Sequence, residues 1–116
     1  MFYVADVVGS GRFYQRLLGK APVEQSEGFC LFLWEGGTKF GLWRQDLVQP
    51  PVTAPSGSGE IGIALGSRAE VDALYQDWVQ LGLEILQAPE LLGFGYSLTA
   101  ADPDGNRIRA YHLENQ

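Results

Sequence analysis

The residues best placed for chemistry lie near the C-terminus, in an alternating run from Arg107 to Tyr111. Successive side chains of a strand point to opposite faces. The two arginines, Arg107 and Arg109, therefore share one face with Tyr111, while Ile108 and Ala110 lie on the other. A face with two guanidinium groups and a phenol lines something polar, and we interpret it as the wall of a binding cleft.

Arg109 has two possible partners, and the sequence leaves both open. Glu60 begins another predicted strand and is expected to face the same space as Arg109, where the two would form a salt bridge. In the first interpretation they only neutralise each other and hold two parts of the chain together. In the second, Arg109 binds an anionic group of a ligand, such as a carboxylate, through two parallel hydrogen bonds.

Aromatic residues supply the second set of candidates. Trp43 is favoured, because it ends a predicted strand on the cleft side, and a flat aromatic ligand could stack on its indole ring. Core packing explains Trp34, Phe94 and Tyr96 at least as well as ligand contact does. Trp78 falls at helical spacing and is expected in the core. The full set of candidate ligand-binding residues is Trp43, Arg109, Glu60, Tyr111, Tyr3, Trp34, Phe94 and Tyr96.

These side chains must be positioned by two similar series of elements. In the first, the patterns predict strand 2–5, a helix capped by Asp6 or Ser10 and ended by Gly19, and strands 22–25, 29–34 and 39–43. In the second, they predict strand 60–65, a helix with a capping box at Ser67 and Glu70 that Gly82 ends, strands 83–87 and 94–100 with a loop at 89–93, and a final turn and strand from residue 101.

Both series read strand, helix, strand, strand, strand, which is typical of a duplicated module. The expected fold is α+β, with two tandem βαβββ modules whose curved mixed sheets enclose a cleft. The single domain 1–116 would divide into a first module at 1–48, a linker loop at 49–59 rich in Pro, Ser and Gly, and a second module at 60–116. Ile61, Ile63 and Ile108 are expected to pack on the helix side.

Composition narrows the classes of function. The 116 residues are 46% hydrophobic and 19% charged, with a formal net charge of −6. An acidic chain without a basic run is a poor nucleic-acid or anionic-membrane binder. No apolar run is long enough for a transmembrane helix, and no signal peptide is visible, so we expect a cytoplasmic protein. Cys30, the only cysteine, lies in an apolar run and is expected to be buried. No nucleophile has a base beside it.

Three segments resemble the glyoxalase / bleomycin-resistance / extradiol-dioxygenase superfamily, also called the vicinal oxygen chelate fold. They are Phe13–Gly19 (FYQRLLG), Gly59–Ala64 (GEIGIA) and Asp102–Asn106 (DPDGN). Within it, the chain is most similar to the phenazine-antibiotic-resistance branch, through Leu42–Trp43, Gly59–Ile63, Val71–Asp72 leading to Trp78, and Gly93–Gly95. The resemblance implies a homodimer and a small-molecule cleft.

The resemblance also implies a metal ion held by His, Gln or Glu side chains of the cleft-facing strands. Glu60 matches one of these positions. Another falls on Arg109, which has no lone pair to give a metal and would repel the ion. The first-strand ligand would lie at or before Met1, and no suitable residue stands near Gly41–Trp43. His112 is expected on the face opposite Arg109. We therefore predict no metal and no other cofactor.

The resulting hypothesis is a metal-independent protein that binds and sequesters a planar aromatic compound, one that can carry an anionic group, as in antibiotic or toxin resistance. The alternative is a metal-dependent lyase, isomerase or dioxygenase of the glyoxalase type. A vestigial cleft in a structural or regulatory module is a third. The first hypothesis expects Trp43 and Arg109 to face one cavity.

Overall fold

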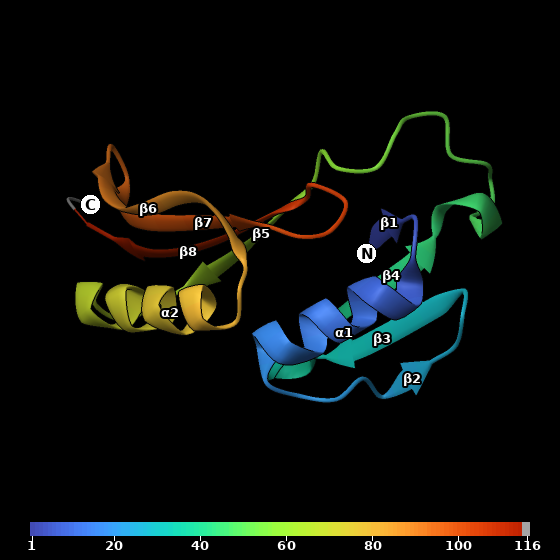
Figure 1. Ribbon diagram of the computed structural model, residues 1–116, viewed down its shortest axis with the longest axis horizontal. Helices are drawn as coiled ribbons and strands as arrows, with labels where there is room; N and C mark the ends of the chain where they lie inside the picture. Colours follow the sequence, from blue (N-terminus) through green and yellow to red (C-terminus); the bar gives the residue numbers. More distant parts are fainter. Residues whose placement is uncertain (115–116) are drawn as a thin grey trace. The chain divides into compact units, whose positions relative to one another are not determined.

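The computed structural model describes residues 1–114, which form two units (Figure 1). The first comprises Met1–Ser58 with Pro103–Gly105, and the second comprises Gly59–Asp102 with the chain from Asn106 onward. The first contains β1 (Phe2–Val4), α1 (Val7–Leu18), β2 (Glu24–Gln25), β3 (Phe29–Leu33), η1 (Glu35–Gly37), β4 (Lys39–Arg44) and η2 (Gln45–Leu47). The second contains β5 (Glu60–Ala64), α2 (Arg68–Gln80), β6 (Glu84–Leu92), β7 (Gly95–Ala101) and β8 (Arg107–Leu113).

In the first unit, α1 covers one face of a four-stranded sheet with the order β1-β4-β3-β2 (Figure 1). The Asp6 side chain accepts a hydrogen bond from the Gly9 amide and begins the helix, and Gly19, at a φ of 69°, ends it. A left-handed φ is easy only for glycine, which explains the stop at this residue. The helix-facing core is apolar and includes Cys30, and burial raises the pKa of its thiol.

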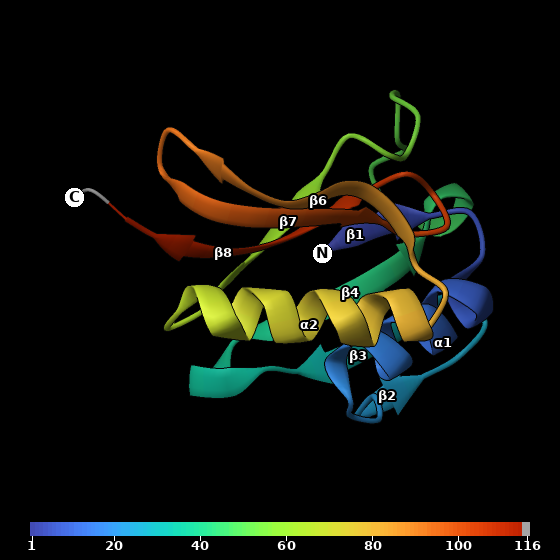
Figure 2. The same cartoon turned by 60° about the vertical axis from the view of Figure 1, so that its left-hand side comes forward.

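In the second unit, α2 covers a sheet with the order β5-β8-β7-β6, as both views of the chain show (Figures 1 and 2). The Ser67 hydroxyl accepts a hydrogen bond from the Glu70 amide and begins the helix. Val71 and Trp78 are its buried residues, and they pack against the face that carries Leu98 and Ile108. Gly82, at a φ of 79°, turns the chain toward β6.

The two strand orders correspond one to one, so the predicted pair of βαβββ modules and the α+β class are confirmed. In each unit the strand before the helix pairs in parallel with the last strand, and the other pairs are antiparallel. The chain turns between β3 and β4 at Gly36 and Gly37, which both have a positive φ. Residues 49–59 contain no helix or strand.

Of the two predicted caps of α1, Asp6 is the one used, since its side chain accepts from the Gly9 amide, and Ser10 is buried inside the helix. Two local predictions were wrong. The Glu70 carboxylate accepts from the Gly66 amide, one residue before the amide that a capping box would use. The loop expected at 89–93 is instead the continuation of β6 to Leu92. Pro89 is tolerated there because β6 is an edge strand and its pairing with β7 shifts register near this residue.

The turn between β7 and β8 has a structural role. Both oxygens of the buried Asp102 carboxylate accept hydrogen bonds from Asn106, one from the amide at 2.8 Å and one from the side chain at 3.2 Å. Asn106 in turn accepts from the Gly59 amide at 3.1 Å. In the first unit, the Asp104 carboxylate accepts from the Ala5 amide and the Ser10 hydroxyl. Among residues 1–114, no helix is long and apolar enough to cross a membrane.

Candidate functional site

Arg109 is the centre of a polar cluster on the face of the second sheet that points away from α2. Its Nε donates to Glu60 Oε2 at 3.0 Å, and its Nη2 donates to Glu60 Oε1 at 3.2 Å. Its Nη1 donates to the Ser97 hydroxyl at 3.0 Å. The salt bridge that the sequence left as one of two interpretations is therefore present, and it is bidentate.

The register of the sheet explains why these groups meet. Arg109 lies between Gly62 of β5 and Thr99 of β7, and residues directly opposite each other share a face. Gly62 leaves room for the neighbouring Tyr111, because a Cβ at this position would stand 3.2 Å from the phenol ring. Apolar residues of the same strands face α2, and burying them holds this register.

Two aromatic rings flank the cluster. The Phe94 ring centre lies 6.0 Å from the Arg109 guanidinium carbon, within range of a cation–π contact. Phe94 also meets Tyr111 edge to face at 6.1 Å between ring centres. Phe94 itself is exposed, so it offers a ring surface beside the guanidinium.

Burial differs sharply within this cluster. The Arg109 side chain is 19% exposed and that of Glu60 is 42% exposed, whereas Ser97 and Thr99 are buried. Thr99 Oγ1 has no hydrogen-bond partner within the described chain. Sequence reasoning missed both hydroxyls. The available signal was their alternation along β7 with Leu98 and Ala100, which marks them as one polar face of a buried strand.

The corresponding face of the first sheet is aromatic. Trp43 meets Tyr3 edge to face at 6.4 Å between ring centres and Phe29 at 6.5 Å. Trp43 and Phe29 are half-buried, and Tyr3 is exposed. Gly41 lies on the same face, two residues before Trp43, and the Met1 side chain lies against it. This face therefore presents ring surfaces without a charged centre.

The two faces can be compared position by position. Tyr3 lies three residues before Asp6, the cap of α1, and Ala64 lies three residues before Ser67, the cap of α2. Tyr3 and Ala64 therefore hold equivalent places. They pair with Trp43 and Tyr111 respectively, so these two aromatic residues are also equivalent. Two residues earlier on the same strands, the first unit has a glycine and the second has Arg109. The charged centre is thus particular to the second unit.

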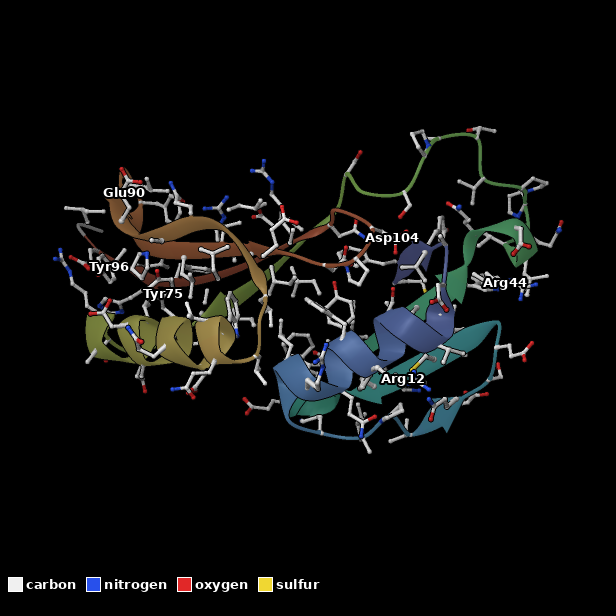
Figure 3. All side chains as sticks on the ribbon, viewed as in Figure 1. Arg12, Arg44, Tyr75, Glu90, Tyr96 and Asp104 are labelled. Atoms are coloured by element: carbon white, nitrogen blue, oxygen red, sulfur yellow. The ribbon has the colours of Figure 1, made fainter. Side chains whose placement is uncertain are left out.

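Three of the residues considered from the sequence lie on the helix sides. Trp34 packs against the core residue Phe40 at 6.1 Å between ring centres. The Tyr96 hydroxyl donates to Asp72 of α2 at 2.7 Å, and Figure 3 shows Tyr96 on the α2 side of its sheet, with Glu90 on the other side. His112 Nδ1 lies 3.1 Å from the Leu65 carbonyl oxygen, on the face opposite Arg109, as expected.

A hollow that the sequence did not indicate lies on the solvent side of α1, where Figure 3 labels Arg12. Its volume is about 840 Å³, and it is lined by Gly9, Arg12, Gln15, Arg16, Gly19, Lys20 and Ala21. Arg12 and Arg16 are four residues apart, which places them on one side of α1, and Lys20 follows the end of the helix. The arrangement is that of a solvated basic helix face, so we assign it no ligand.

The residues do not fit a metal ion of the kind that the fold implies. Both oxygens of Glu60 are engaged by Arg109, whose positive charge would repel a divalent cation. Within residues 1–114, no three His, Cys, Asp or Glu side chains come close enough together to hold an ion. Sites for such ions usually supply three or more protein ligands.

Fold and sequence together define the class of protein. Residues 1–110 match the model of the Glyoxalase/Bleomycin resistance protein/Dioxygenase superfamily, and the chain belongs to this superfamily. Among curated proteins, it is 29% identical over 117 residues to the phenazine antibiotic resistance protein EhpR of Enterobacter agglomerans, a match that covers 98% of this chain and 89% of EhpR.

Solved structures agree on the fold. The solution structure of protein ATC0852 from Agrobacterium tumefaciens is 40% identical, with a TM-score of 0.86 over 97% of this chain and 93% of that one. A lactoylglutathione lyase from the same organism gives a TM-score of 0.78 at 19% identity, over 95% of this chain and 87% of the lyase. At that identity the likeness concerns the fold alone.

Proposed function

We propose that this chain binds and sequesters a planar aromatic small molecule without a metal ion, in the service of antibiotic or toxin resistance. The observation that carries the proposal is the bidentate Glu60–Arg109 pair, in which an arginine stands at one expected metal-ligand position and engages both oxygens of the carboxylate at another. The relation to EhpR supports a resistance role. The partly exposed ring of Trp43 supports aromatic stacking.

The test measures ligand binding directly on each face. Equilibrium dialysis of the chelator-treated protein against phenazine, phenazine-1-carboxamide and phenazine-1-carboxylate should give saturable binding of at least one compound at micromolar concentration. Trp43→Ala should weaken binding about tenfold or more, because the stacking surface is lost. Trp34→Phe is the matched control, because Trp34 lies on the helix side.

Arg109→Gln should likewise weaken binding, whereas Arg16→Gln, which removes an exposed charge from α1, should not. No saturable binding of any of the three compounds would contradict the proposal.

The alternative is a metal-dependent enzyme of the glyoxalase type. It predicts stoichiometric uptake of Ni²⁺, Zn²⁺ or Mn²⁺ by the purified protein and loss of that uptake in Glu60→Gln. We also propose that the chain works as a homodimer, which sedimentation velocity would test at micromolar protein. That Trp43 and Arg109 line one cavity stays a prediction.

A further inference from the structure

We infer that the Arg109 site selects its ligand by charge, binding an uncharged hydrogen-bond acceptor, such as a carboxamide or quinone carbonyl, in preference to a carboxylate. The inference rests on the proposed function, because it specifies the chemical class of the ligand at the same site. It departs from the sequence-based expectation that Arg109 receives an anion.

The first argument is that the charge of Arg109 is already balanced. Glu60 accepts two hydrogen bonds from the guanidinium, at 3.0 and 3.2 Å. A ligand carboxylate that approached Arg109 would therefore lie beside the Glu60 carboxylate as well. The Arg109 side chain is only 19% exposed, so a carboxylate that reached it would be partly removed from water, whereas Glu60 itself is 42% exposed, so salt screens part of the repulsion.

The second argument concerns the remaining charges on this face. Register places Glu84 and Glu90 of β6 on the same side as Ser97 and Arg109, and places Arg107 directly opposite Glu60. Three carboxylates therefore stand against two arginines, so the face has no positive excess to attract an anion. Figure 3 shows Glu90 on this side of the sheet, away from α2.

The third argument is that donors remain for a neutral acceptor. A guanidinium carries five N–H groups, and Glu60 and Ser97 use three of those of Arg109. The hydroxyl of Thr99, which lies directly opposite Arg109 and is 2% exposed, has no partner within the described chain. A buried hydroxyl without a partner is costly, so a carbonyl oxygen that accepted from this group would be favoured without adding charge.

The experiment compares two ligands of nearly the same shape, phenazine-1-carboxamide and phenazine-1-carboxylate, by equilibrium dialysis at pH 7.5. The wild-type protein should bind the amide about tenfold more tightly than the acid. In Glu60→Gln, Arg109 keeps its charge and loses its anionic partner. The ratio of the affinity for the amide to that for the acid should therefore fall about tenfold, to equal binding or to a preference for the acid. Asp77→Asn on the exposed side of α2 makes the same change in net charge and should leave the preference unaltered.

The outcomes separate this inference from the proposed function. Equal affinities, or tighter binding of the carboxylate to the wild-type protein, would overturn the inference while the proposed function stands. A preference that persists unchanged in a folded Glu60→Gln variant, checked by circular dichroism, would also overturn it. If neither compound nor phenazine binds, the proposed function itself fails.

Discussion

In the first unit, aromatic rings hold the helix to its sheet. Phe40 is the hub, and its ring meets four others, those of Phe2, Tyr14, Phe32 and Trp34. In the second unit, the equivalent position is Ile108, and polar contacts add to the packing of Val71 and Trp78 of α2 against the sheet. Arg68 donates twice to Glu114 at 2.6 Å, and Tyr96 donates to Asp72 at 2.7 Å. One strand order therefore supports two different ways of attaching a helix.

The outer faces of the two sheets differ as well. At equivalent positions the first sheet carries Trp43 and a glycine, and the second carries Tyr111 and Arg109. Backbone pairing fixes which residues share a face, but it does not fix their chemistry. Duplication of a module therefore leaves each copy free to supply a different kind of contact, ring surface in one and hydrogen-bond donors in the other.

The largest expected effect concerns the backbone at Gly95, where the hairpin between β6 and β7 enters β7. Gly95 starts β7 at a φ of 153°, and a Cβ added there would overlap the carbonyl oxygen of His112. Gly95→Ala should destabilise the protein by roughly 4 kcal/mol or more, since backbone has to move. Gly93→Ala, where a Cβ meets open space, is the control. Urea unfolding followed by circular dichroism measures both, and similar midpoints for the two variants would contradict the prediction.

The next effect tests the aromatic hub of the first unit. Phe40→Ala should cost about 3–5 kcal/mol, because the neighbouring rings cannot fill the space left behind. Ile108→Val at the equivalent position of the second unit should cost only about 0.5–1.5 kcal/mol. If urea unfolding gave Phe40→Ala no larger a cost than Ile108→Val, the ring of Phe40 would not hold the core of the first unit together as we infer.

Most of the fold could be predicted because its signals are local. Alternation in 107–111 gives the two faces of β8, and glycines at helix ends and hairpins mark where elements stop. The errors lie where one local signal competed with another. Pro89 is a reliable breaker in a central strand, but β6 is an edge strand, and its neighbours 87 and 90 shift register around it.

The candidate site was predicted only in part, for a physical reason. The Glu60–Arg109 pairing follows from the faces of two strands, and both of its interpretations could be stated from the sequence. Tyr96 was considered a ligand-binding candidate, although the alternation that puts Leu98 and Ala100 on the helix side puts Tyr96 there as well. The buried hydroxyls Ser97 and Thr99 escaped notice because such residues carry no signal of chemistry by themselves.

A smaller effect tests the hydrogen bond between α2 and β7. Tyr96→Phe removes the bond to Asp72 and should cost about 0.5 kcal/mol, at the lower end of the usual range because the side chain is partly exposed. Tyr75→Phe is the matched control, a half-buried tyrosine of α2 also labelled in Figure 3, and should change little. Equal effects of the two substitutions on the urea midpoint would argue against this bond.

The smallest effect depends on pH and concerns the Arg68–Glu114 pair. The hydrogen bonds from Arg68 are the main cause that lowers the pKa of Glu114 below its ordinary value of 4.5. A carboxylate whose pKa is lowered by folding contributes stability above the pKa of the unfolded chain, and this contribution is lost as the pH falls through the folded value. The difference in the free energy of unfolding between the wild-type protein and Glu114→Gln should therefore be present at pH 7 and vanish at pH 3.

Trp78, the one tryptophan of the second unit, can report this change. In the Trp34→Phe, Trp43→Phe double variant, the fluorescence of Trp78 reports unfolding. The urea midpoints of this double variant with and without Glu114→Gln should converge as the pH is lowered. Glu84→Gln, at an exposed carboxylate of the same unit, is the control for a change of net charge alone. A gap between Glu114→Gln and the reference that stayed constant from pH 7 to 3 would mean that ionisation of Glu114 does not stabilise α2. The polar attachment of this helix would then rest on the Tyr96–Asp72 bond alone.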